Sequence, residues 1–269
     1  MLALGLLAAA LGGCGRLGYY AQSVGGHLDL MGRSRPIPDL LAPGAETPPE
    51  LRRRLALVRD IRAFASAELG LPDNPSYRSF AALERPFAVW SVVAAPPLGL
   101  EPRTWCFPFA GCVAYRGYFD RDAARRFADR LERRGDDVYL AGVPAYSTLG
   151  WLDDPLPSTV VHWPPRHLAG LLFHELAHQV VYVDDDSGFN EAFATTVERV
   201  GVRRWLRAAG REAALATVAA EEREEALLLD LLARTRERLA AVYGGEGSRA
   251  ERLRRKEAVL EDQIGRAHV

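Results

Sequence analysis

Apolar and polar positions alternate along the chain in a way that predicts helices on both sides of a short β-rich stretch. Between Pro49 and Leu69 the apolar residues recur at helical spacing, and Gly70 and Pro72 end the pattern. Three runs rich in β-branched and aromatic residues predict strands: Phe87–Ala94, Cys112–Tyr118 and Asp137–Val143. A helix that starts at Asp120 and ends at Gly135 is expected before the last strand.

Helical spacing dominates the rest of the chain. Further helices are predicted at Tyr19–Met31, around His174, from about Phe189, over Arg211–Val242 and from Ser248, with a Pro-rich connection at Pro36–Pro49. The apolar stripe of the long helix is expected to pack in a core; it comprises Leu227, Leu228, Leu231, Leu232, Leu239 and Val242. Strands that precede a run of helices predict an α+β fold, with a small β-sheet lobe packed on a mainly helical lobe.

Composition and net charge limit the number of domains but identify no binding partner. The chain has 269 residues, 48% of them hydrophobic and 26% charged, enough for one large domain or two close-packed lobes. The formal net charge is -1, and the sequence gives no indication of nucleic-acid binding. The arginine runs Arg52–Arg54 and Arg133-Arg134 are expected to be solvated helix faces, with a membrane-contacting patch as the alternative.

The chemistry is concentrated in the segment from Phe173 to Ala194. His174 and His178 are four residues apart on a predicted helix, so their side chains share one face and can bind one metal ion. Glu175 follows the first histidine, where a carboxylate can act as the base of a zinc hydrolase. A catalytic zinc site is therefore predicted, with one Zn²⁺ per chain.

Such a site needs a third protein ligand and an open position for water. We predict Glu191, because the Asp-rich loop before it can reverse the chain and bring a second helix to the metal. Asp184 is the competing ligand, but its position would require a tight turn near Val181, and a β-branched residue does not favour one. Glu198, two turns beyond Glu191, either orients a ligand histidine or is a surface acid.

The combination of His174-Glu175-x-x-His178 with the run from Asn190 to Gly201 resembles the gluzincin group of zinc metallopeptidases. The chain also resembles a family of bacterial lipoproteins described as aminopeptidases, over about Tyr19 to Leu239. The resemblance implies a zincin-like peptidase that acts on peptides, with zinc bound by His174, His178 and Glu191, Glu175 as catalytic base, and Asn190 and Glu198 next to the ligands. The Gly-x-Met-Glu-Asn element that holds the substrate amine in well-known aminopeptidases is absent from the sequence.

Related enzymes add a donor that stabilises the oxyanion, for which the sequence offers Tyr146, Tyr182 and Tyr243, with Tyr146 preferred. The substrate is expected to run beside an edge strand at Val143–Gly150, because Pro144 suits a strand start or edge.

The alternative function is a non-catalytic, zinc-scaffolded binding or assembly lipoprotein. A zinc hydrolase acting on cell-wall or other amide bonds is a third interpretation.

The N-terminal segment indicates where the protein acts. Residues 1–10 form an apolar run too short to span a bilayer, and they lead to Leu11-Gly12-Gly13-Cys14, which resembles a bacterial lipobox and would end a signal peptide over residues 1–14. The alternative is a short core segment with a free cysteine. Cys14 would carry the lipid and anchor the enzyme at the periplasmic face, by analogy with other lipoproteins at the outer membrane. Residues 15–48 would form a tether and N-terminal segment, and residues 49–262 the peptidase domain.

Two further features complete the prediction. Cys106 and Cys112 have five residues between them around Pro108 and Gly111, and in an oxidising periplasm they are expected to form a disulfide; two buried thiols or a second metal site are the alternatives. Residues 263–269 read like the translation of a sequencing adapter, which would mean that a further C-terminal segment is missing from this sequence.

Overall fold

The fold is mixed α+β and mostly helical, as the sequence predicts. A computed structural model describes residues 18–107, 111–148 and 150–267. After a helix at residues 18–32, the elements are β1 Ser34–Pro36, α2 Ile37–Leu41, α3 Pro49–Leu69, β2 Ser79–Ala81, β3 Val89–Ala95, β4 Trp105–Phe107, β5 Gly111–Val113, β6 Arg116–Tyr118, α4 Arg121–Glu132, β7 Asp137–Val143, β8 Leu156–Pro157, α5 Pro165–His178, α6 Ser187–Ala208, α7 Ala213–Gly244 and α8 Arg249–Ala267.

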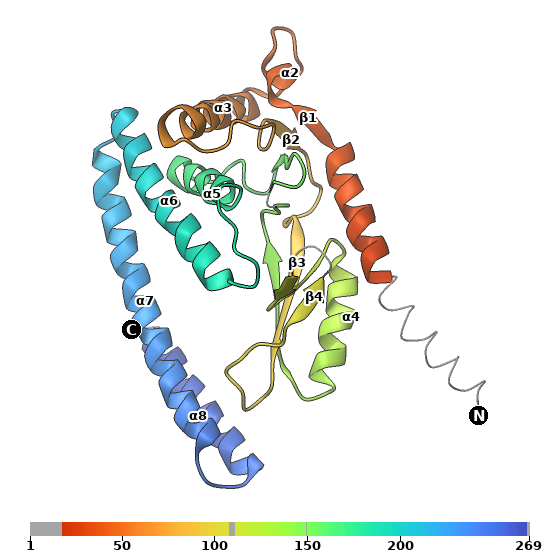
Figure 1. Ribbon diagram of the computed structural model, residues 1–269, viewed down its shortest axis with the longest axis vertical. Coiled ribbons are helices and arrows are strands. Elements are labelled where there is room, and N and C mark those ends of the chain that lie inside the picture. Colours follow the sequence, from red (N-terminus) through yellow and green to blue (C-terminus); the bar gives the residue numbers. More distant parts are fainter. Residues whose placement is uncertain (1–17, 108–110, 149, 268–269) are drawn as a thin grey trace, which may run out of the picture.

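The larger core lies in the helical lobe, where α3 and α6 pack on α5 (Figure 1). The residues of α3 that recur at helical spacing are buried, and the helix ends at Gly70, whose φ of 66° favours glycine. The central helix, α5, is apolar over much of its surface, because it is covered on more than one side. The close packing of α5 on α6 positions the side chains of the candidate site.

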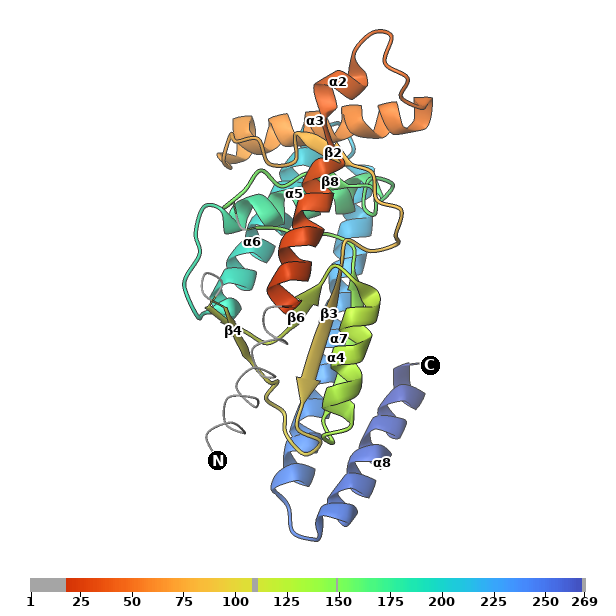
Figure 2. The same cartoon turned by 90° about the vertical axis from the view of Figure 1, so that its right-hand side faces the viewer.

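The smaller core lies between α4 and an antiparallel sheet with the strand order β6-β3-β7 (Figure 2). Asp120 caps α4 by accepting a hydrogen bond from the backbone N–H of Ala123 at 2.6 Å, as predicted. The strand β7 pairs along its whole length with β3, from Val89 opposite Val143 to Ala95 opposite Asp137. A second small sheet, β1-β2-β8, joins the N-terminal part of the chain to the helical lobe.

The predicted disulfide is confirmed. Cys106 and Cys112 are joined and face each other across the β4–β5 hairpin. The hairpin changes one predicted element, since the single strand expected at Cys112–Tyr118 is divided into β5, which pairs with β4, and β6, which pairs with β3. The lipid-attachment site predicted at Cys14 lies outside the described residues.

The edge strand predicted at Val143–Gly150 is wrong. β7 ends at Val143, and residues 144–148 are irregular. Two local causes explain the end of the strand: Pro144 has no N–H for a ladder, and the backbone N–H of Thr148 donates instead to the buried carboxylate of Asp154, at 2.8 Å. Any substrate strand must therefore lie elsewhere.

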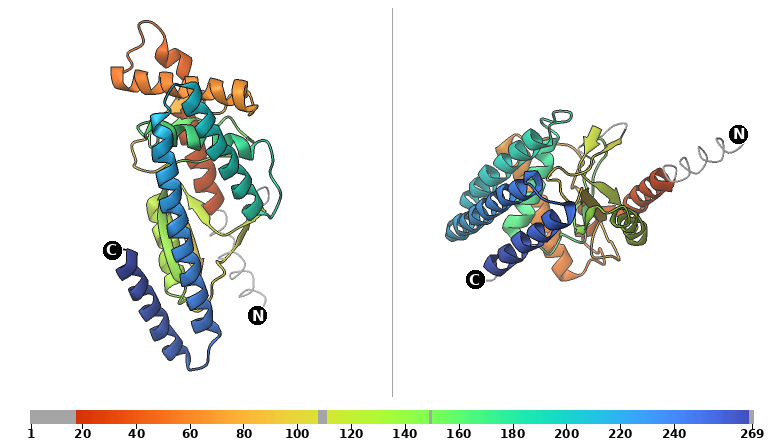
Figure 3. Two further views of the ribbon diagram at one scale, coloured as in Figure 1. Left: turned by 90° about the vertical axis from the view of Figure 1, so that its left-hand side faces the viewer. Right: turned by 90° about the horizontal axis from the view of Figure 1, so that it is seen from below.

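The helices α7 and α8 form an antiparallel hairpin along the outside of the molecule (Figure 3). The expected core packing of the α7 leucines is largely wrong, because Leu227, Leu228 and Leu232 are exposed by 69, 53 and 53%. Within the described part of α7, the buried residues are Val218 and Thr235. No helix among the described residues is long and apolar enough to cross a membrane.

Candidate metal centre and active site

The helix α5 carries the two histidines on its last turns. It starts after Pro164, with Pro165 in its first turn, where the missing N–H costs no helical hydrogen bond. Its buried side packs into the larger core through six residues: Leu168, Ala169, Leu172, Phe173, Leu176 and Ala177. Because His174 and His178 are one helical turn apart, both rings lie on the side that faces α6.

A loop of acidic residues reverses the chain between α5 and α6. Asp185 has a φ of 59°, a left-handed conformation that aspartate tolerates, and the Asp186 side chain caps α6 by accepting from the Phe189 N–H at 2.9 Å. Asp185 also accepts a hydrogen bond from the backbone N–H of Cys112 at 3.3 Å, which ties the loop to the disulfide hairpin. The reversal brings the first turn of α6 back over the end of α5.

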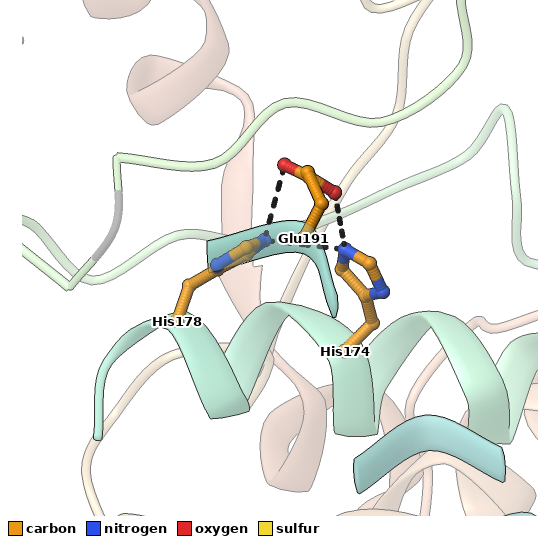
Figure 4. A group of neighbouring side chains, drawn as sticks. All are labelled: His174, His178 and Glu191. Atoms are coloured by element: carbon orange, nitrogen blue, oxygen red, sulfur yellow. Dashed lines mark hydrogen bonds and ion pairs between the residues drawn. The ribbon is translucent and has the colours of Figure 1, made fainter. Parts of the chain in front are cut away.

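As a result, three possible ligand groups converge (Figure 4). The Nε2 atoms of His174 and His178 are 3.1 Å apart, and the carboxylate oxygens of Glu191 lie 3.3 Å from the first and 3.7 Å from the second. One donor atom from each residue lies within 4.8 Å of the others. Among the described residues, Asp184 does not join this group.

The separations fit a common metal ion. With zinc–nitrogen bonds of about 2.0 to 2.1 Å, two nitrogens of a tetrahedral site are roughly 3.3 to 3.4 Å apart. The observed 3.1, 3.3 and 3.7 Å lie close to that range. Two nitrogens and one carboxylate, with no fourth donor in the group among the described residues, match the ligand set of zinc sites that keep a position open.

Glu198 orients one of the histidines. Its Oε2 atom lies 3.1 Å from Nδ1 of His174, so the ring is held by the nitrogen that faces away from Glu191. The helix α5 leaves space for this carboxylate at Gly170, where a Cβ atom would lie 2.8 Å from Glu198 Oε1. Of the two interpretations of Glu198 left open by the sequence, the contact favours the orienting role.

Asn190 holds the loop rather than a histidine. Its side chain is 2% exposed and forms two hydrogen bonds of 2.8 Å with the backbone of Val183, accepting from the N–H and donating to the carbonyl. This pair closes the loop onto the first turn of α6. The adjacent Glu191 is thereby fixed in position, although its own side chain is exposed.

The two imidazoles have different electrostatic surroundings. For His174, burial lowers the pKa, but the hydrogen bond that Nδ1 donates to Glu198 and the charges of nearby glutamates outweigh it, and the pKa is raised. For His178, burial and the neighbouring His174 lower the pKa, and its Nδ1 atom has no hydrogen-bond partner among the described residues. A neutral His178 is the form that binds a metal.

Glu175 lies beside the converging donors, and its carboxyl group contacts a buried polar cluster. Burial raises its pKa, which the charge of His174 and a hydrogen bond with Ser147 partly offset. Ser147 is held in turn by Asp154, which is fully buried and accepts hydrogen bonds from Thr148 Oγ1 at 3.0 Å and from Ser147 Oγ at 3.4 Å. The irregular segment after β7 thus positions a hydroxyl group against the predicted base.

The tyrosines proposed from the sequence lie in different places. Tyr146 packs its ring on His27 and Phe119, and burial raises its pKa to about 12. Tyr182 is in the loop after α5 and is 39% exposed. Tyr243 lies at the end of α7, where burial and Asp137 raise its pKa, and no described contact links it to the histidines.

Tyr115, which sequence reasoning missed, lies closer to the chemistry. The residue as a whole is 52% exposed, but burial of its hydroxyl group raises the pKa of the phenol, and Tyr182, Glu191 and Glu175 raise it further. The residue sits between β5 and β6, in the stretch predicted as one continuous strand. The break between β5 and β6 is what places Tyr115 outside a strand, and the apolar pattern of the sequence does not predict that break.

Comparison with known proteins gives one result that bears on this site. A family model described as "Putative aminopeptidase" matches residues 18–267, nearly the whole chain. Neither the curated proteins nor the solved structures give a match. The matched range includes both lobes, the disulfide hairpin and the α5–α6 pair.

Proposed function

The chain belongs to this putative aminopeptidase family, and we propose that it is a zinc-dependent peptidase with a zincin-like pair of metal-binding helices. His174, His178 and Glu191 would hold one Zn²⁺, and Glu175 would be the general base. The convergence of two imidazoles and a carboxylate, with Glu175 beside them, carries the proposal. A purely structural metal site has no need of such a base, so the geometry favours an enzyme over a binding protein.

A bound zinc ion would act as a Lewis acid, lowering the pKa of water to about 7 and polarising a peptide carbonyl. Glu175 accepts the proton of the attacking water and delivers it to the departing amine. Ser147 orients the Glu175 carboxylate through their hydrogen bond. Glu198 fixes the His174 ring through Nδ1, so that Nε2 points toward Glu191 and His178.

Tyr115 is the better-supported donor to the substrate oxyanion. The charges of Glu191 and Glu175 contribute to the raised pKa of its phenol, whereas the ring contacts of Tyr146 are with His27 and Phe119. A donor must lie where negative charge develops on the substrate, next to the base and the metal ligands. Tyr146 stays a prediction, and Tyr115→Phe against Tyr146→Phe compares the two by their loss of kcat.

We further propose that Cys14 carries a lipid and holds the enzyme at the periplasmic face of the outer membrane. The support is the lipobox-like sequence before it and the disulfide, which an oxidising compartment permits. Fractionation of cells that express the full chain or Cys14→Ala tests this. A Cys14→Ala protein that still sediments with membranes would contradict it.

The central experiment measures metal and turnover on the same samples. Elemental analysis should give about one zinc per wild-type chain and far less for His178→Ala. Glu175→Gln should retain zinc and lose peptide cleavage, because it removes the base and not a ligand. Peptides with free and acetylated amino termini then separate an aminopeptidase from an endopeptidase. Stoichiometric zinc without cleavage of any peptide would refute the enzymatic function.

A further inference from the structure

A pocket opens beside the metal centre where α5, α6 and α7 meet. Its volume is about 630 Å³, and both His174 and Glu175 are part of its wall. Glu198 lines it too, whereas His178 and Glu191 do not, so the pocket lies on the Nδ1 side of His174. A substrate bound over Glu175 could extend a side chain into it. Figure 3 shows α7 running along the outside of the helices that carry the site.

The floor of the pocket is apolar. Val202 and Val218 are buried in the larger core, and Leu171 and Trp163 pack against that core while lining the pocket. Such a floor suits the methylene groups of a long side chain.

The wall of the pocket is acidic. Five glutamates line it, against two arginines, Arg166 and Arg199. Both arginines are already paired with α7, Arg166 with Glu221 and Arg199 with Glu225, the latter at 2.6 Å. A third arginine, Arg203 of α6, pairs with Glu222 from outside the lining, so the five glutamates outnumber the arginines paired with them by two.

Glu222 is the acid with unused hydrogen-bonding capacity. Its Oε2 pairs with Arg203 of α6, whereas its Oε1 is buried and has no hydrogen-bond partner among the described residues. A buried carboxylate oxygen without a donor is costly, and a donor supplied by a ligand would remove that cost. Glu222 lines the pocket, so a bound substrate could supply one.

We propose that this pocket binds a basic side chain, lysine or arginine, of a peptide substrate, with Glu222 accepting a hydrogen bond from the cationic group. The inference rests on the proposed peptidase function and names the substrate class. The methylene groups would lie on the apolar floor, and the charged end would reach the α7 carboxylates. A free α-amino group offers the same cation but lacks the methylene stem that the floor accommodates.

The first test changes only the peptide. Zinc-loaded Glu175→Gln, which binds without turnover, is titrated by calorimetry with alanine pentapeptides that carry lysine or norleucine at the first or second position. Each peptide is used with a free and with an acetylated amino terminus. Lysine peptides should bind roughly tenfold to a hundredfold more tightly than norleucine peptides, the range for a hydrogen bond to a charged group. The preference should persist when the amino terminus is acetylated.

The second test changes the acid. Adding Glu222→Gln should reduce the preference for lysine by roughly tenfold, whereas Glu224→Gln, an exposed neighbour on α7 that does not line the pocket, should leave it unchanged. Thermal unfolding of both variants checks that α7 stays folded.

Three results would overturn the proposal: equal affinity for lysine and norleucine, a preference that follows the free α-amino group, and equal effects of the two substitutions. Cleavage of the same peptides by the wild type is measured separately. If binding shows the lysine preference but no peptide is cleaved, the peptidase function fails and the pocket assignment stands. If peptides are cleaved without the preference, the reverse holds.

Discussion

Replacing Gly170 by alanine should weaken metal binding without harming the fold. Gly170 is on α5, one turn before His174, and a Cβ atom there would lie 2.8 Å from Oε1 and 3.4 Å from the carboxyl carbon of Glu198. The 2.8 Å distance is too short for a real contact, but the obstructing atom is at the end of a flexible side chain. The carboxylate can therefore move away, and in doing so it would leave Nδ1 of His174, to which it is now 3.1 Å.

The substitution has two opposing effects, one on metal affinity and one on the stability of the helix. Loss of a hydrogen-bonded group behind a ligand histidine typically lowers metal affinity by about 10- to 100-fold, or about 1.4 to 2.7 kcal/mol. Alanine in a helix is more favourable than glycine by up to about 1 kcal/mol. Gly170→Ala should therefore be at least as stable as the wild type without metal, while its affinity for zinc falls. Simple damage to the fold would lower both.

The assay is competition for zinc with a chromophoric chelator, together with urea unfolding of the metal-free protein. Gly25→Ala is the matched control, because Gly25 is an exposed helical glycine whose added Cβ would meet nothing within 4 Å. Glu198→Ala should weaken zinc binding to a similar degree, and the double variant with Gly170→Ala should lose little more, since both remove one contact. Wild-type zinc affinity in Gly170→Ala, or full additivity in the double variant, would refute the reasoning.

Three further predictions concern the supports of the site and of the fold. Asn190→Ala removes both hydrogen bonds to the backbone of Val183, and it should lower the free energy of unfolding by about 1 to 3 kcal/mol and weaken zinc binding, as measured by urea unfolding and zinc titration. Arg103 holds the pKa of Asp136 below its usual value, so their pairing stabilises the fold above the unfolded-state pKa and is lost as the pH falls through the folded-state pKa. Asp136→Asn should therefore be less stable than the wild type at pH 7, and urea midpoints that do not converge below about pH 4 would contradict this. Replacing both cysteines of the β4–β5 disulfide by serine should lower stability by roughly 2 to 3 kcal/mol, whereas equal unfolding midpoints would show that so small a loop contributes nothing.

Elements bounded by strong local signals were predictable from the sequence. The bounds of α3 agree with the prediction because prolines precede it and Gly70 ends it, and β7 occupies its predicted range. The leucines of α7 show the opposite case. Three consecutive leucines, Leu227 to Leu229, cannot all face one core from a helix, and all three are more than half exposed. The spacing of the leucines indicates that some of them must be exposed, but a prediction based on apolar content alone does not detect this.

The convergence of the three proposed metal ligands was predictable because it depends on short-range geometry. His174 and His178 are fixed by the helical repeat, and Glu191 needs only a short loop to return to them. The alternative ligand Asp184 was ranked lower for a local reason too, the cost of a tight turn at a β-branched residue. Glu198 follows from the same helical arithmetic, two turns beyond Glu191, and it contacts His174 as that spacing suggests.

The residues that surround the ligands come from distant segments, and no periodicity relates them to the site. Ser147 reaches Glu175 because Asp154, fully buried, draws the backbone of Thr148 out of the sheet. The hydrogen bonds that the Asp154 carboxylate accepts oppose the rise in its pKa that burial causes. They also hold residues 144–148 in an irregular path. The competition between a strand ladder and a buried acid is a tertiary effect, invisible to alternation along the chain. The identity of the proposed metal ligands is therefore encoded locally in this protein, whereas the groups around Glu175 and the pocket beside it are set by how the two lobes and α7 pack around α5.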